Sequence, residues 1–261
     1  MIAVERIRKE AEERLRHALA RDPVCRIGRI VRSSGEILHA SGIRASIGSR
    51  CLIETEEHEH RSAEVVGFDA GSLLIMPEQG MRGIVRGARV YVESQSPSPL
   101  VGDGLLGRVI DARGKALDGR PQPDVSYPWP LLGIPVNPMT RQRIGTPFDV
   151  GVCAINALAT LGRGMRMGLF AGSGVGKTTL LGMMAQHDAA EVVVVGMIGE
   201  RGREIREFVE DHLGAARHRS VVVAAAADDT ALGRLHGAYR AAAAAEYFRA
   251  RDAMSCWSST P

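Results

Sequence analysis

The residues best suited to chemistry form one glycine-rich run, Ala171-Gly-Ser-Gly-Val-Gly-Lys-Thr178, which matches the Walker A pattern with Ala in place of the first Gly. Glycines let successive backbone N–H groups turn inward onto phosphate oxygens, and the amino end of the following helix favours negative charge. Lys177 is then placed to bridge the β- and γ-phosphates of ATP, and Thr178 to offer its hydroxyl to Mg²⁺. A glycine-rich turn without a ligand is the plain structural alternative, which the Lys-Thr pair at this offset disfavours.

A second candidate is Gly199-Glu-Arg-Gly-Arg-Glu204, directly after the apolar run 192–198. A carboxylate at the carboxyl end of a strand beside the P-loop strand overlooks the γ-phosphate, so Glu200 could orient or deprotonate an attacking water. In the alternative interpretation, acidic residues at a helix amino end merely favour its dipole, and this pattern alone leaves both open. Glu200 and Lys177 are the catalytic candidates. The candidates for nucleotide binding are Ala171, Gly172, Ser173, Gly174, Val175, Gly176, Lys177, Thr178, Thr179 and Arg201.

Strands and helices alternate around these motifs. The order strand–helix–strand predicts a parallel sheet with helices on both faces, in an α/β fold of the P-loop type. The near-continuous Val192-Val-Val-Val195 is typical of a strand buried on both faces. Residues 106–111 are a further expected strand, and a helix is expected around 152–161. The remaining strands are expected at 166–170, 192–197 and 221–225, and the helices at 176–187, 202–213 and 230–251.

Residues 22–94 have a different period. Short alternating segments separated by Gly and polar turns at intervals of about ten residues predict a small β-barrel or sandwich. The run Glu56-Glu-His-Glu-His60 within it is interpreted as a solvated hairpin tip rather than a metal site. The Ser/Pro-rich residues 94–99 read as a linker, so that 95–252 form the nucleotide-binding domain and 253–261 an aberrant tail.

The first 21 residues form a third region. Val4, Ile7, Ala11 and Leu15 recur at helical spacing between Glu and Arg, which predicts an amphipathic helix over 2–20. This helix could pack on its own domain, or it could dock on a partner protein or a membrane surface. The net charge of +3 on 261 residues does not indicate a nucleic-acid partner. No secretory signal or membrane-spanning run of about 20 apolar residues is evident, which indicates a cytoplasmic protein.

Together these motifs resemble the catalytic ATPase of type III protein export, related to the F1/V1 catalytic subunit. The resemblance covers about residues 24–252. It rests on the P-loop, on Ile198-Gly-Glu-Arg-Gly-Arg-Glu204, on Leu106-Gly-Arg-Val-Ile-Asp111, on Gly151-Val-Cys-Ala-Ile-Asn-Ala-Leu158 and on Leu181-Gly-Met-Met-Ala185. Ala-Gly-Ser-Gly-Val-Gly-Lys with Leu-Gly-Met-Met favours the flagellar branch over the virulence-secretion branch.

The resemblance implies a six-stranded barrel, a RecA-like nucleotide domain and a homo-hexamer with sites between subunits. It also implies that ATP hydrolysis energises protein export, with Glu200 activating the water. The N-terminal helix would engage a stator-like regulator and the export gate, and chaperone–substrate complexes would be further partners. The implied location is cytoplasmic and peripheral to the inner membrane.

The last residues depart from the family. Where relatives have Val-Leu-Leu-Val-Val-Asp-Ser with the Mg²⁺-holding Walker B Asp, this chain has Ala253-Met-Ser-Cys-Trp-Ser-Ser-Thr-Pro261. Read two bases later, with plausible codons, the same nucleotides encode the expected strand. A frameshift near codons 252–253 is therefore predicted, with negligible ATPase activity and poor solubility for this polypeptide. Sequencing the gene tests the frameshift, which is refuted if the downstream nucleotides encode no family-like continuation in the other reading frame.

Two other functions stay open at this point. The chain could belong to another ring ATPase, either a rotary ATP synthase catalytic subunit or an RNA-translocating helicase, although residues 24–92 offer only Phe68 and Tyr91 for stacking bases. It could also be a non-enzymatic remnant that binds nucleotide without turnover.

Overall fold

The computed structural model describes residues 27–93, 98–172, 174–187, 189–251 and 255–260. The predicted N-terminal helix and most of the predicted linker therefore lie outside the described residues. The chain divides into two compact units, residues 1–96 and 97–261. In the described part of the chain, no helix is both long and apolar enough to cross a membrane.

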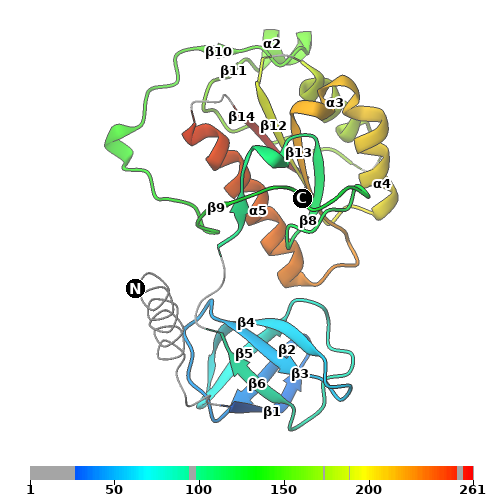
Figure 1. Cartoon of the computed structure of the whole chain (residues 1–261). Helices are drawn as coiled ribbons and strands as arrows, with labels where there is room; N and C mark the ends of the chain where they lie inside the picture. The colour runs from blue at the N-terminus through cyan, green and yellow to red at the C-terminus, as the bar shows by residue number, and fades with distance from the viewer. Residues whose placement is uncertain (1–26, 94–97, 173, 188, 252–254, 261) are drawn as a thin grey trace, which may run out of the picture. The chain divides into compact units, whose positions relative to one another are not determined.

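The first unit is a closed barrel of six strands in the order β1-β2-β5-β4-β3-β6, as the alternating pattern and the resemblance predicted (Figure 1). All neighbouring strands pair antiparallel. The strands are β1 Ile27–Ser34, β2 Ile37–Ser41, β3 Arg50–Glu54, β4 His60–Asp69, β5 Ser72–Pro77 and β6 Arg89–Val92.

Alternation along the barrel strands places every second side chain inside. On β3, Cys51 and Ile53 are fully buried while the residues next to them are half-buried. On β5, Leu73 and Ile75 are likewise buried between half-buried neighbours. Such a period-2 pattern lets one face of each strand fill the barrel interior. The run 56–60 lies at the β3–β4 connection, where the Thr55 N–H donates to the Glu59 carbonyl, so the hairpin-tip interpretation is confirmed.

The second unit is built on a parallel sheet with the strand order β14-β12-β13-β8. Its regular elements are, in chain order, β7 Leu100–Val101, the 3₁₀ turn η1 Asp103–Leu105, β8 Arg108–Asp111, β9 Tyr127–Pro128, η2 Pro138–Thr140, β10 Pro147–Phe148, α2 Cys153–Leu158, β11 Leu161–Gly162, α3 Lys177–Gln186, β12 Val192–Ile198, α4 Gly202–Glu207, the π-helical turn η3 Phe208–His212, η4 Gly214–Arg219, β13 Ser220–Ala225, α5 Ala231–Ala250 and β14 Ser255–Thr260.

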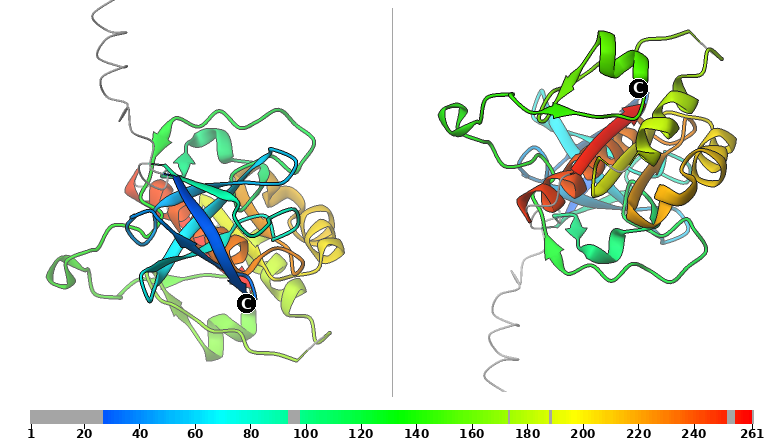
Figure 2. Two further views of the ribbon diagram at one scale, coloured as in Figure 1. Left: turned by 90° about the horizontal axis from the view of Figure 1, so that it is seen from below. Right: turned by 90° about the horizontal axis from the view of Figure 1, so that it is seen from above.

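Helices cover both faces of this sheet, as predicted (Figures 1 and 2). Val192 and Val194 of β12 pack with α5, whereas Val193 and Val195 pack on the other face with α3 and η3. The continuous valine run therefore serves two apolar cores at once. Helix α5 can lie close to the sheet because Gly237 faces it: a Cβ there would stand 2.9 Å from the Ala225 Cβ.

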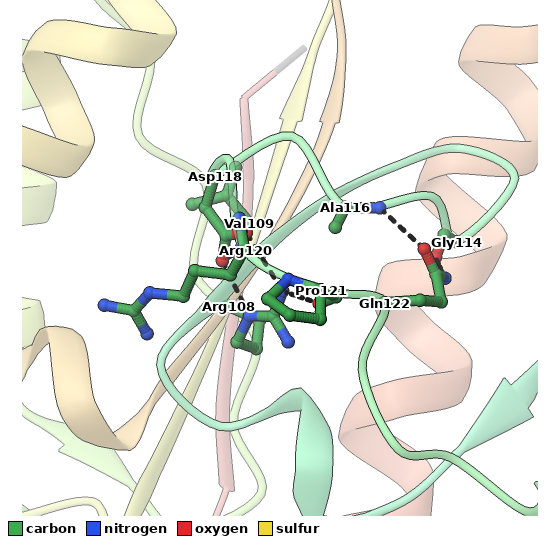
Figure 3. A network of polar contacts seen from close by, with 8 residues as sticks. All are labelled: Arg108, Val109, Gly114, Ala116, Asp118, Arg120, Pro121 and Gln122. Carbon is green, nitrogen blue, oxygen red and sulfur yellow. Dashed lines mark hydrogen bonds and ion pairs between the residues drawn. The ribbon is translucent and has the colours of Figure 1, made fainter.

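The loop after β8 is held by a buried ion pair (Figure 3). The Arg108 Nε and Nη2 donate to the two carboxylate oxygens of Asp118 at 2.7 and 3.0 Å, and Nη2 also donates to the Pro121 carbonyl. The backbone N–H groups of Val109 and Arg120 donate to the same carboxylate. The two ionic side chains are 11% and 1% exposed, so this pair fixes the loop against the edge strand of the sheet.

One prediction about the sheet was wrong. Residues 166–170 form no strand: they run unpaired, and Phe170 is 96% exposed. A strand needs a hydrogen-bonded neighbour, and no described strand pairs with this segment. The segment assigned above to an aberrant tail contributes a strand of its own, β14 Ser255–Thr260, which pairs parallel with β12 and sets Val192 opposite Ser255. An open sheet edge offers unpaired N–H and C=O groups that an extended segment can satisfy.

Candidate functional site

The P-loop adopts a conformation that only glycine accepts easily. Gly174 and Gly176 have φ values of 76° and 93°, in the left-handed region, and Gly176 directly precedes α3. A Cβ at Gly172, Gly174 or Gly176 would meet no atom within 4 Å, so the space above the loop is open. Because the first N–H groups of a helix lack intrahelical partners, this open loop presents donors suited to an anion.

The other predicted nucleotide-binding residues lie around this loop. Ala171 and Val175 are exposed, Thr178 is half-buried in the first turn of α3, and the adjacent Thr179 is exposed. Ser173 lies outside the described residues. The Thr178 hydroxyl thus stands at the amino end of α3, where the sequence predicts a metal contact.

Lys177 and Glu200 come together across the loop, although 23 positions separate them in the chain. The Lys177 Nζ lies 3.8 Å from Glu200 Oε1, and the two side chains are 25% and 17% exposed. One residue opens α3 and the other follows β12, so the contact joins the two sequence motifs. The structure therefore brings the two catalytic candidates to one place.

The backbone around Glu200 is fixed by the neighbouring strand β13. The Gly199 N–H donates to the Ala225 carbonyl at 2.7 Å, and the Ala227 N–H donates to the Glu200 carbonyl at 2.9 Å. Gly199 has a φ of 76°, which turns the chain sharply as it leaves β12. These contacts lie at the carboxyl ends of parallel strands, the usual place for ligand sites in such sheets.

Glu200 and Glu204 lie at different places around the start of helix α4. Helix α4 begins at Gly202 with Arg201 as its N-cap, and the acidic residue in its first turn is Glu204. Arg201 is 69% exposed on its side chain and pairs with Glu204 at 3.5 Å. Glu204 thus occupies the position that favours the helix dipole, whereas Glu200 faces Lys177.

Sequence reasoning missed the backbone partners of this site. The carbonyl of Ala225 and the N–H of Ala227 hold Glu200 in place, but alanines carry no signal of such a role. In the described residues, no group of three or more His, Cys, Asp or Glu side chains could hold a metal ion.

A parallel sheet with a P-loop before α3 and a carboxylate after β12 defines a P-loop fold. The family model "ATP synthase alpha/beta family, nucleotide-binding domain" matches residues 151–256, and "ATP synthase alpha/beta family, beta-barrel domain" matches residues 30–92. The chain therefore belongs to the ATP synthase alpha/beta family.

Within this family the chain is similar to type III export ATPases, as its motifs predicted. It is 49% identical over 239 residues to a flagellum-specific ATP synthase of Salmonella typhimurium, covering 87% of this chain and 52% of the relative. It is 44% identical to the flagellum-specific ATP synthase of Bacillus subtilis, with 87% and 53% covered. It is 42% identical to a type 3 secretion system ATPase of Sinorhizobium fredii, with 85% and 50% covered.

A solved structure shares the fold. The assembled ATPase EscN from the type III secretion system of enteropathogenic E. coli matches with a TM-score of 0.82 and 36% identity, covering 89% of this chain and 56% of that one. EscN in complex with its central stalk EscO matches with a TM-score of 0.78. The chain spans about half the length of the curated relatives it matches.

Proposed function

We propose that this chain binds ATP with Mg²⁺ at the P-loop and is a subunit of a protein-exporting ATPase, with the flagellar branch favoured. The observation that carries the proposal is the Lys177–Glu200 contact across an open glycine loop. An ammonium, a carboxylate and a helix amino end at one point are among the groups that P-loop enzymes use for phosphoryl transfer.

The residues present fit the nucleotide and its metal. The glycines of the P-loop leave open the space that Cβ atoms would otherwise narrow, and the amino end of α3 favours the negative phosphates. Lys177 would bind the β- and γ-phosphates, and Thr178 would hold Mg²⁺ through its hydroxyl. Bound Mg²⁺ supplies charge neutralisation for the phosphate oxygens. Ala171, Gly172, Ser173, Gly174, Val175, Gly176, Thr179 and Arg201 complete the proposed binding set.

The ion pair between Lys177 and Glu200 has a consequence for hydrolysis. A triphosphate carries more negative charge than one carboxylate, so its arrival favours transfer of the Lys177 ammonium from Glu200 to the phosphates. Glu200 could then accept a proton from the water that attacks the γ-phosphate. We propose Glu200 as the general base of this reaction.

The wider role is proposed from the relatives. They are named flagellum-specific ATP synthases and type 3 secretion ATPases, and the identities are higher to the flagellar ones quoted above. The proposed partners are further copies in a homo-hexamer, a stator-like regulator and the export gate reached through residues 2–20, and chaperone–substrate complexes. The EscN structures, one assembled and one with its stalk, support assembly of this kind. The proposed location is cytoplasmic, peripheral to the inner membrane.

Calorimetric titration with Mg-ATP tests the binding step. Lys177→Ala should weaken binding by roughly 10- to 100-fold, because a hydrogen bond to a charged group contributes about 1.5–3 kcal/mol. Lys115→Ala is the matched control, since Lys115 lies in the loop after β8 and should not alter the affinity. Equal affinities for the chain and its Lys177→Ala variant would refute the proposal.

Phosphate release separates an enzyme from a protein that only binds nucleotide. Any turnover by the chain should fall about 10²- to 10⁴-fold in Glu200→Gln, the range that a general base contributes. Binding without turnover in the unaltered chain would favour the non-enzymatic alternative. Turnover that survives unchanged in Glu200→Gln would exclude Glu200 as the base.

A further inference from the structure

Arg219 makes a set of contacts that the nucleotide site does not directly explain. It ends η4, immediately before β13, and its guanidinium reaches the carboxyl end of the P-loop helix α3. Nη2 donates to the carbonyls of Ala185 and His187, both at 3.0 Å, and of Gln186 at 3.3 Å. Nη1 donates to the Ala190 carbonyl. One side chain thus binds a cluster of carbonyls where α3 ends.

This placement suits the electrostatics of α3. The last carbonyls of a helix have no intrahelical partners, and a cation at that end complements the helix dipole. Arginine presents a planar set of N–H donors that can reach several carbonyls at once, which lysine cannot do. With ten residues, α3 is about 15 Å long, and Lys177 opens it at the opposite end.

Apolar packing holds α3 only weakly. Its buried residues are Gly182 and Ala185, which are small, and Leu181 is partly buried. Gly182 lies so close to η3 that a Cβ would stand 2.7 Å from the His212 Cβ, and the Gln186 Nε2 donates to the His212 carbonyl. Because little apolar surface of α3 is buried, the polar contacts at its carboxyl end contribute much of what holds the helix in position.

Strand β13 connects Arg219 to the other half of the site. At the amino end of the strand, Arg219 holds α3, which carries Lys177. At the carboxyl end, Ala225 and Ala227 hold the backbone on either side of Glu200. One strand therefore anchors both the helix that bears the ammonium and the bend that bears the carboxylate.

We infer that Arg219 is a positioning residue of the nucleotide site, because it clamps the carboxyl end of α3 to the start of β13 and so sets where Lys177 stands relative to Glu200. Its expected effect on affinity rests on the proposed nucleotide binding. Its effect on the order of α3 does not.

The test compares the full chain with Arg219→Gln, Arg219→Lys and the control Arg251→Gln. Arg251 is the C-cap residue of α5 and forms an ion pair with the exposed Asp103. The control therefore removes an arginine charge at the carboxyl end of a different helix. Three properties are measured: the affinity for a fluorescent ATP analogue with Mg²⁺, thermal unfolding without nucleotide, and amide hydrogen exchange of the peptide 177–187.

Arg219→Gln should bind the analogue about tenfold more weakly, equivalent to about 1.4 kcal/mol and within the range for a charge at a helix end. Its 177–187 peptide should exchange faster. Arg219→Lys should recover part of the affinity, because it keeps the charge without the planar donors. Arg251→Gln should bind like the unaltered chain.

Unchanged affinity in folded Arg219→Gln would overturn the inference, and so would an equal loss in Arg251→Gln, which would indicate general destabilisation. If Arg219→Gln does not fold, the affinity of Arg219→Lys is compared with those of the unaltered chain and of Arg251→Gln, and unchanged affinity in Arg219→Lys overturns the inference. If the unaltered chain binds no nucleotide, the proposed function fails, and exchange alone decides: faster exchange of 177–187 supports the clamp and unchanged exchange overturns it.

Discussion

Replacing Asp118 with Asn should strongly destabilise the second unit, residues 97–261. Asp118 is 1% exposed on its side chain and accepts two hydrogen bonds from Arg108, which is 11% exposed (Figure 3). The substitution keeps the shape of the side chain but removes its charge. The Arg108 guanidinium would then stay buried, with the Pro121 carbonyl as a remaining acceptor.

The magnitude follows from the burial of the pair. Removing one member of a buried ion pair costs about 3–5 kcal/mol, because the other charge is left without compensation. The backbone N–H groups of Val109 and Arg120 also lose a charged acceptor. A loss near the upper end of that range would be a large share of the 5–15 kcal/mol typical of a folded domain.

The matched control is Asp103→Asn, which breaks a pair with Arg251 whose side chains are 62% and 52% exposed. Exposed pairs contribute little, so this variant should unfold at nearly the same urea concentration as the unaltered chain. Urea unfolding followed by tryptophan fluorescence measures both. If Asp118→Asn unfolds within about 1 kcal/mol of the unaltered chain, the ion pair does not hold the loop as described.

The same pair predicts a pH dependence. Hydrogen bonds from Arg108 hold the pKa of the Asp118 carboxyl well below its usual range. A carboxyl with a lowered folded-state pKa stabilises the fold above its unfolded pKa of about 3.9, and that contribution is lost as the pH falls towards the folded value. On lowering the pH from about 5 to about 2, the free energy of unfolding should therefore fall less in Asp118→Asn than in the unaltered chain. This range runs from above the unfolded pKa of Asp118 towards its lowered folded pKa.

Three further predictions concern single side chains. Gly237→Val should lower the melting temperature, costing about 1–3 kcal/mol, because its side chain would press on Ala225. Thr230→Ala should cost about 1 kcal/mol in urea unfolding, since the Thr230 hydroxyl accepts the Gly233 N–H at the start of α5. Burial raises the pKa of the Cys51 thiol to about 11, so a maleimide should label exposed Cys153 in the native protein well before Cys51.

Much of the fold follows from local patterns. The valine runs of β12 and β13 were predictable because a strand that is buried on both faces is continuously apolar. The barrel strands and the long helix α5 were predictable because their buried residues recur at the period of the element. The P-loop was recognisable because its chemistry is encoded in adjacent residues. These features depend on sequence neighbours, which a single chain displays directly.

Features that depend on distant partners were not predictable. Residues 166–170 have a strand-like composition but find no strand to pair with among the described elements, whereas the polar residues 255–260 pair with β12. The Arg219 contacts with α3 join residues about 30 positions apart, and an arginine before a strand gives no sign of them. Pairing is settled by the three-dimensional neighbourhood rather than by propensity.

Lys177 and Glu200 face one another at the proposed nucleotide site, and two substitutions of opposite expected effect test this pairing. The Mg-ATP dissociation constants of the chain, Lys177→Ala and Glu200→Gln are compared by titration. We expect weaker binding for Lys177→Ala. Glu200→Gln should bind at least as tightly as the unaltered chain, because removing the carboxylate leaves the Lys177 ammonium available to the phosphates. Unaltered affinity in Lys177→Ala, or a matching loss in both variants, would contradict it.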